Sequence, residues 1–128
     1  MLGDATVFAT IAVRDAGLAK DFYQDTLGLR LVDENDAGCM YESGAGKLFV
    51  YQSPTAGTSQ ATSAAWEVDD IEAVVDELQQ RGVVFEQYDI PDADVNGYVY
   101  TLGPQKAAWF TDPDGNILSV GSSIQSSH

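Results

Sequence analysis

The chain has little cysteine, histidine and positive charge, and each scarcity narrows the class of protein. Its 128 residues include one cysteine, Cys39, and one histidine, His128. A lone cysteine cannot form a disulfide within the chain, which suits a reducing compartment, so we expect a cytoplasmic protein. No apolar run approaches the roughly 20 residues that span a bilayer. The first residues also lack the basic and then apolar order of a secretory signal.

The scarcity of basic side chains makes the chain strongly acidic. Six basic residues stand against 20 acidic ones, which gives a formal net charge of −14. A field of this sign repels phosphate backbones and anionic membrane surfaces, so we expect neither nucleic acid nor membrane as a partner. The charge is most simply a solubilising surface. Adaptation to high salt is the alternative, because 14 of the acids are Asp and only three residues are Lys.

The sequence contains an internal repeat. Its length is that of a single domain. Thr10–Asp15 precedes a helical pattern that ends at Leu27-Gly28. Fifty-five residues later, Ala65–Asp70 precedes a second helical pattern that ends at Arg81-Gly82. Repetition of one supersecondary unit predicts two modules that share a core.

Caps and apolar spacing predict the elements of each module. Asp15 is suited to cap a helix over 16–27, and Asp69 or Asp70 a helix over 71–81. We expect strands over 7–13, 29–33, 39–43, 47–52, 64–68, 83–88, 107–111 and 117–121. Module one then spans about 5–53, a linker about 54–62, module two about 63–121 and a frayed tail 122–128. The extra segment 89–105 fits a lid, a passive surface excursion or part of a subunit contact.

The motifs at matching places of the two modules resemble those of the vicinal oxygen chelate superfamily, which contains glyoxalase I, extradiol dioxygenases and bleomycin-binding proteins. The resemblance rests on Val13-Arg14-Asp15, Phe22-Tyr23, Leu27-Gly28-Leu29, Glu67–Ile71 and Asp112–Asn116. It implies an α+β fold in which two tandem βαβββ modules form one curved mixed-sheet domain around a central pocket, with helices outside. It also implies a homodimer, a small-molecule ligand and, in the enzymes, a divalent ion chelated by substrate oxygens.

The metal ligands that this resemblance implies are missing from the chain. Similar enzymes carry His or Glu where this sequence has Phe8, Ser63 and Ser119. A benzyl group cannot bind a metal, and a neutral hydroxyl is a poor ligand for a divalent ion. The fourth position falls on the strand 47–52, whose nearest oxygen donors are Tyr51 and Gln52.

We therefore expect neither a metal nor another cofactor. Carboxylates elsewhere, such as Glu42 and Glu67, are the alternative metal ligands, although their spacing is not typical of a site. We expect His128, at the end of the tail, to be solvated rather than to act as a ligand.

Without a metal, strand alternation predicts a mostly apolar pocket with a few hydroxyls and one carboxylate. Simple core packing is the alternative for each aromatic residue in it. Such a pocket suits a small apolar or aromatic ligand, or a cationic one given the acidic field. Its expected lining residues are Phe8, Thr10, Tyr51, Ser63, Glu67, Tyr98, Tyr100, Trp109 and Ser119.

Two functions follow from this pocket. The first is a metal-free binding protein similar to the bleomycin-binding members. The second is a lyase, isomerase or dioxygenase-like enzyme with an atypical metal site, or with Glu67 as the acid or base, because a carboxylate in an apolar cavity can take a proton. Serine hydrolysis is disfavoured, because Ser63 and Ser119 have no partner histidine. Cys39 is expected to be a buried, inert thiol rather than a nucleophile.

Overall fold

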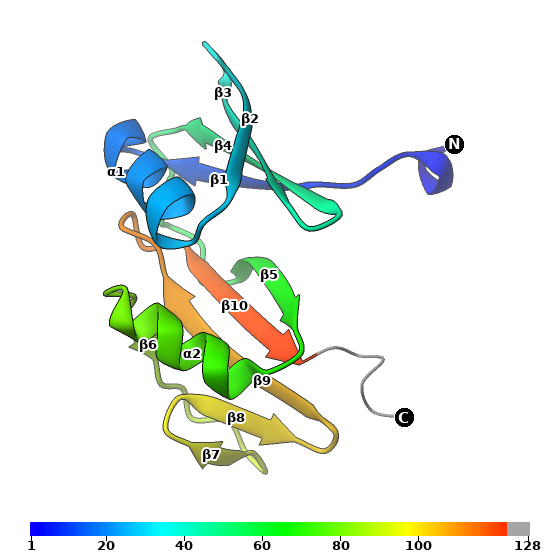
Figure 1. Ribbon diagram of the computed structural model, residues 1–128, viewed down its shortest axis with the longest axis vertical. Helices are drawn as coiled ribbons and strands as arrows, with labels where there is room; N and C mark the ends of the chain where they lie inside the picture. The colour runs from blue at the N-terminus through cyan, green and yellow to red at the C-terminus, as the bar shows by residue number, and fades with distance from the viewer. Residues whose placement is uncertain (123–128) are drawn as a thin grey trace.

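The computed structural model describes residues 1–122 and shows two similar halves, one above the other in Figure 1. A short 3-10 turn, η1 (Leu2–Asp4), precedes them. The first half contains β1 (Ala9–Val13), α1 (Ala16–Lys20), η2 (Asp21–Thr26), β2 (Arg30–Asn35), β3 (Gly38–Ser43) and β4 (Gly46–Gln52). The second contains β5 (Thr62–Val68), α2 (Ile71–Gln80), β6 (Phe85–Glu86), β7 (Asp94–Asn96), β8 (Val99–Leu102), β9 (Gln105–Thr111) and β10 (Ile117–Ser122). His128 and most of the expected tail lie outside the described residues.

The two sheets repeat one strand order. The first runs β1-β4-β3-β2, and the second runs β5-β10-β9-β8-β7. In each sheet the strand before the helix pairs in parallel with the last strand, while the other neighbours are antiparallel. This arrangement confirms the expected α+β class with two mixed sheets. The sheets are hydrogen-bonded separately, and their edge strands β1 and β5 contact each other at the junction. No helix within residues 1–122 has the length and apolar character to cross a membrane.

Both helices begin where their caps predict. The Asp15 carboxylate accepts a hydrogen bond from the Leu18 N–H at 3.0 Å, and that of Asp70 accepts one from Ala73 at 3.2 Å. The first helix changes character along its length, because α1 ends at Lys20 and the chain continues as the π-helical turn η2. Such wider turns depend on tertiary packing rather than on local sequence, so the continuous pattern over 16–27 did not predict it.

The strand expected over 83–88 is wrong in extent. Only Phe85–Glu86 is a strand, and it pairs with Phe110 and Trp109 of β9. The chain then leaves the sheet and returns as β8, where Tyr100 pairs with Ala107 on the same edge of β9. β6 and β8 therefore act as one split strand, equivalent to β2. The segment 89–105, whose role the sequence left open, contributes β7 and β8 to the sheet.

Alternate side chains of both sheets face the helices and form one hydrophobic core. In Figure 1, α2 crosses in front of β9 and β10, which places this core between the helix and the sheet. We call the opposite surface of the sheets the helix-free face. The largest fully buried core side chains are Tyr23, Tyr41, Phe110, Ile11, Leu118 and Val13.

The turn Asp112–Asn116 fastens the two halves together. The Tyr23 hydroxyl of the first half donates to Asp112 Oδ2 at 2.7 Å. Asn116 Nδ2 donates both to that oxygen and to the Ala12 carbonyl, each at 2.8 Å. The linker joins through the Gly57 N–H, which donates to Asn116 Oδ1 at 3.3 Å. Thus a motif that carries the family resemblance has a structural role at the junction.

Candidate functional site

The positions expected to hold metal ligands do not form a metal site. Phe8 lies ahead of β1 with 44% of its surface exposed, Ser63 is half-buried on β5, and Ser119 is buried on β10. Within residues 1–122, no three His, Cys, Asp or Glu side chains gather closely enough to hold a metal ion. Glu42, an alternative ligand, forms an ion pair with Arg30. These donors do not fit the divalent ion of the superfamily's enzymes.

Several predicted pocket residues meet on the helix-free face of the second sheet. Ser119 and Trp109 are cross-strand partners. The Tyr100 ring packs edge-to-face against Trp109, with centroids 5.5 Å apart, and its hydroxyl accepts the Tyr88 N–H. Tyr88 also packs against Trp109, at 5.6 Å. The sequence did not place Tyr88 in the site, because it follows the two-residue strand β6 rather than lying within a regular strand.

The other predicted residues are more dispersed. On the first sheet, Tyr51 stacks on Phe49 at 6.1 Å, and Thr10 lies beside Phe49 across β1 and β4. Tyr98 does not join the helix-free face. Its ring lies 5.9 Å from Phe85 and packs against the core on the helix side. Core packing, the alternative given for each aromatic, therefore describes Tyr98.

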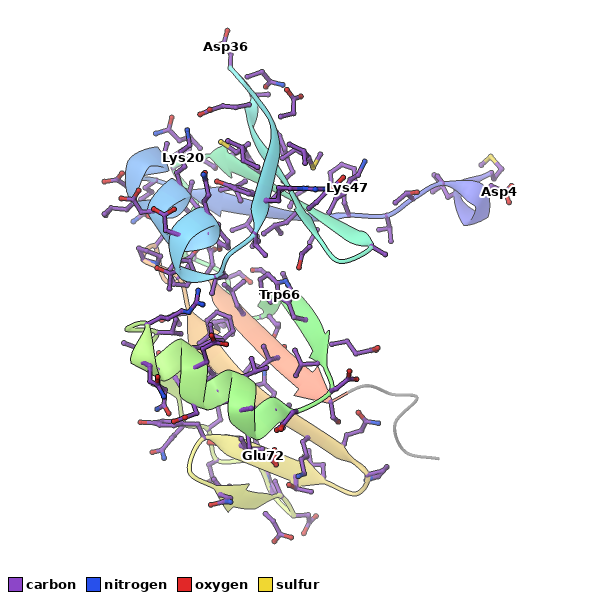
Figure 2. All side chains as sticks on the ribbon, in the orientation of Figure 1. Asp4, Lys20, Asp36, Lys47, Trp66 and Glu72 are labelled. Atoms are coloured by element: carbon purple, nitrogen blue, oxygen red, sulfur yellow. The ribbon has the colours of Figure 1, made fainter. Side chains whose placement is uncertain are left out.

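A groove of about 670 Å³ separates the two halves at the edge strand β5. We call it the outer groove, and its size is typical of small-molecule sites. Of the predicted pocket residues, only Glu67 lines it, and that side chain is exposed. Lys47, on β4 of the first half, also lines the groove, and Figure 2 shows it above Trp66 of β5. The full lining is Ala9, residues 43–48 and residues 64–68.

Within residues 1–122, Lys47 is the one basic side chain without an ion pair or a hydrogen-bond acceptor. Four of the six bases form ion pairs with Glu side chains, and Arg14 donates to the Pro54 carbonyl at 3.3 Å. Lys47 makes no such contact with any part of the chain that the structure describes. The outer groove therefore carries one basic side chain, Lys47, and one acidic side chain, Glu67.

A smaller cavity of about 150 Å³ adjoins the outer groove, and we call it the inner cavity. Ser43, Trp66 and Val68 line both spaces and so form their shared boundary. Figure 2 shows Trp66 on β5, near the junction of the two halves. The Trp66 Nε1–H donates to Ser43 Oγ at 3.0 Å, and its ring stacks on Phe110 at 6.2 Å. The inner cavity is lined by Leu27, Leu29, Ser43, Trp66, Val68, Val74, Leu78, Phe110 and Val120.

Sequence reasoning missed Trp66 for a geometric reason. Alternation along β5 directs Ser63 and Glu67 to one face and Trp66 to the other, so only the first two were expected in a pocket. Because β5 is an edge strand beside a gap between the halves, both of its faces border open space. One signal was available: an indole N–H needs a hydrogen-bond partner when it is shielded from water.

The lone thiol occupies a separate place, between α1 and the β2–β3 hairpin. Cys39 is half-buried rather than fully buried as expected, and its Sγ lies 3.7 Å from Glu34 Oε2. Burial and then the Glu34 carboxylate raise the pKa of Cys39. A thiol that stays protonated is a weak nucleophile, which favours the inert interpretation.

The fold defines a class of protein: two tandem βαβββ halves with a ligand-sized space between them. Residues 6–120 match the Glyoxalase/Bleomycin resistance protein/Dioxygenase superfamily, and the chain belongs to it. Among curated proteins, none matches the chain significantly.

Solved structures of similar fold span nearly the whole chain. A glyoxalase family protein from Enterococcus faecalis is 21% identical with a TM-score of 0.72, covering 94% of this chain and 99% of its own. Lactoylglutathione lyase from Agrobacterium tumefaciens is 19% identical with a TM-score of 0.67, covering 94% of both chains. At these identities the likeness establishes the fold alone.

Proposed function

We propose that this protein binds a small apolar or aromatic molecule, without a metal, in the space between its two halves. One observation carries the proposal: a groove of about 670 Å³, lined by both halves, adjoins a largely apolar cavity of about 150 Å³. Among residues 1–122, the walls of these spaces contain a single carboxylate, Glu67, and no histidine or cysteine. This composition suits shape and apolar contact rather than metal chelation.

A second candidate is an enzyme of the lyase, isomerase or dioxygenase-like kind. It is favoured by the place of Glu67 on the groove wall, where a carboxylate can take a proton from a bound molecule. One structure of similar fold carries the name lactoylglutathione lyase. An enzyme of this kind would need Glu67 for turnover, so Glu67→Gln should abolish any activity found while leaving binding intact.

A thermal-shift screen of aromatic antibiotics and metabolites tests the binding proposal. A ligand at a hundred times its Kd stabilises the folded protein by about 2.7 kcal/mol, which is readily measured as a higher Tm. Ala65→Trp, which places a bulky ring in the outer groove, should remove the shift. Val84→Trp is the control, because Val84 is 65% exposed and lines neither space. A broad library that yields no stabilising compound would contradict the proposal.

Elemental analysis tests the metal-free part separately. Protein purified without added metal and then dialysed should contain no stoichiometric divalent ion. A retained ion at one equivalent per chain would favour the second candidate function and overturn this part of the proposal.

A further inference from the structure

We infer that the inner cavity is a subsite for a compact, uncharged ring or branched alkyl group, and that the molecule that fills both spaces is an arylalkyl or branched-alkyl carboxylate. The inner-cavity part stands on its own observations. The carboxylate part rests on the proposed function, because it requires the outer groove to be a binding site.

The lining of the inner cavity selects an apolar occupant. Eight of its nine lining residues are hydrophobic, and Ser43 already accepts a hydrogen bond from Trp66. Water in this open space finds few polar partners on the wall, so an apolar group of about benzene size should displace it favourably. The volume therefore limits the occupant to a ring or a branched alkyl group.

The inner cavity is open to solvent rather than sealed in the core. Trp66, Val68, Val74 and Leu78 all pack against the core, yet each remains only partly buried. Their exposed surfaces come from β5 and α2, and none of the charged side chains that the structure describes lines the cavity. An apolar group can therefore enter without first unfolding either half.

The outer groove determines which chemical group the other end of the ligand carries. Three residues line both spaces, so a molecule can extend from one into the other past Trp66. Lys47 offers a positive charge there without an ion pair inside residues 1–122, whereas Glu67 already takes part in an interaction. At physiological salt, charges beyond about 8 Å are largely screened, so acids far from the groove act weakly on Lys47. The nearest acid on the sheet, its cross-strand partner Glu42, forms an ion pair with Arg30. These features together favour a carboxylate.

Benzene alone, followed by NMR of ¹⁵N- and methyl-labelled protein, tests the inner cavity. Titration should shift the Trp66 indole N–H and the methyl groups of Val74 and Leu78. Val74→Phe places a ring in the cavity and should weaken benzene binding about tenfold or more, because Val74 lines the cavity and the added ring occupies the volume that benzene needs. Val84→Phe, the same change on an exposed valine, should leave it unchanged.

A second variant keeps the test decisive if Val74→Phe fails to fold. Leu78→Ala enlarges the cavity and should favour the larger probe indole over benzene about tenfold compared with the unmodified protein. The subsite is disproved if benzene leaves the Trp66 signal unmoved, or if neither variant changes the binding of these probes.

Phenylacetate, 2-phenylethanol and 2-phenylethylamine, which share the ring and differ in charge, test the carboxylate. Phenylacetate should bind most tightly, and Lys47→Gln should abolish this preference without changing benzene binding. If the three probes bind equally while benzene still binds beside Trp66, the inference of a carboxylate ligand is wrong and the inference of an apolar subsite stands. If a library ligand binds in the outer groove but benzene does not bind, the inference of an apolar subsite is wrong and the proposed binding function stands.

Discussion

Asp112 is only 5% exposed, yet its carboxylate accepts four hydrogen bonds. Two come from the Tyr23 hydroxyl and Asn116 Nδ2, and two from the backbone N–H groups of Asp114 and Asn116. A buried carboxylate is tolerated only when its oxygens are satisfied in this way. Tyr23 and Asp112 lie in different halves, so this one carboxylate links the two modules.

Replacing Tyr23 by Phe should therefore weaken the junction. The change removes one donor to a buried carboxylate and should lower the free energy of unfolding by about 1.5–3 kcal/mol, measured by urea denaturation. Tyr88→Phe is the matched control, because Tyr88 is 39% exposed, and it should cost less than about 0.5 kcal/mol. Equal losses in the two variants would show that the Tyr23 hydroxyl has no special role.

Buried tyrosines should also make stability fall in alkali. Burial, and then the neighbouring Cys39, raises the pKa of Tyr41 to about 12. An unfolded tyrosine ionises near pH 10, so folding favours the neutral phenol. The contribution of Tyr41 to the free energy of unfolding is complete below about pH 10 and is lost as the pH rises through about 12. Urea denaturation between pH 8 and 11.5 should show the decline, and Tyr41→Phe should make it shallower; an unchanged slope would contradict the assignment.

At the scale of elements, features set by neighbouring residues were predictable and those set by tertiary packing were not. The caps Asp15 and Asp70 mark both helix starts, because a carboxylate and the N–H groups that it accepts from lie within three residues. The division of one strand into β6 and β8 depends instead on where the returning chain meets β9. The outer groove likewise depends on the gap between the halves, so the sequence predicted Glu67 but neither Lys47 nor Trp66.

Substitutions at two glycines in turns test how tightly the linker packs against the turn Asp112–Asn116. A Cβ on Gly57, at φ +72°, would lie 1.9 Å from the Asp114 carbonyl oxygen, whereas one on Gly44, at φ +56°, would meet no atom within 4 Å. Gly44→Ala should cost about 1–2 kcal/mol of backbone strain. Gly57→Ala should cost about 3 kcal/mol or more, because linker and turn must also separate. Denaturation of both variants checks this, and similar losses would mean that the linker moves freely.

At the scale of the whole molecule, unbalanced charge should make stability depend on salt. The chain has 20 acidic and only six basic side chains, so its acidic side chains repel one another. Dissolved salt screens this repulsion. The Tm should rise between 10 mM and about 0.5 M NaCl and then level off. A continued rise into molar salt would support the alternative of salt adaptation, and a Tm that falls with salt would contradict the repulsion argument.

Association of two copies, implied by the family resemblance, stays a prediction. We propose that the chain is a homodimer in solution, and sedimentation equilibrium should then report twice the mass of one chain. The measurement should be made at several salt concentrations, because two copies with a charge of −14 each repel at low ionic strength. A single-chain mass at every salt concentration would exclude the dimer.

The division of β6 and β8 has a practical consequence for protein engineering. Their partners Trp109 and Ala107 are separated by a single residue of β9, so the two ends of the intervening loop lie about 7 Å apart. A guest peptide inserted between Tyr88 and β7 would start and finish on the same ladder while Tyr88, β7 and Tyr98 keep their contacts. This edge of the sheet is therefore the natural place to display a foreign sequence.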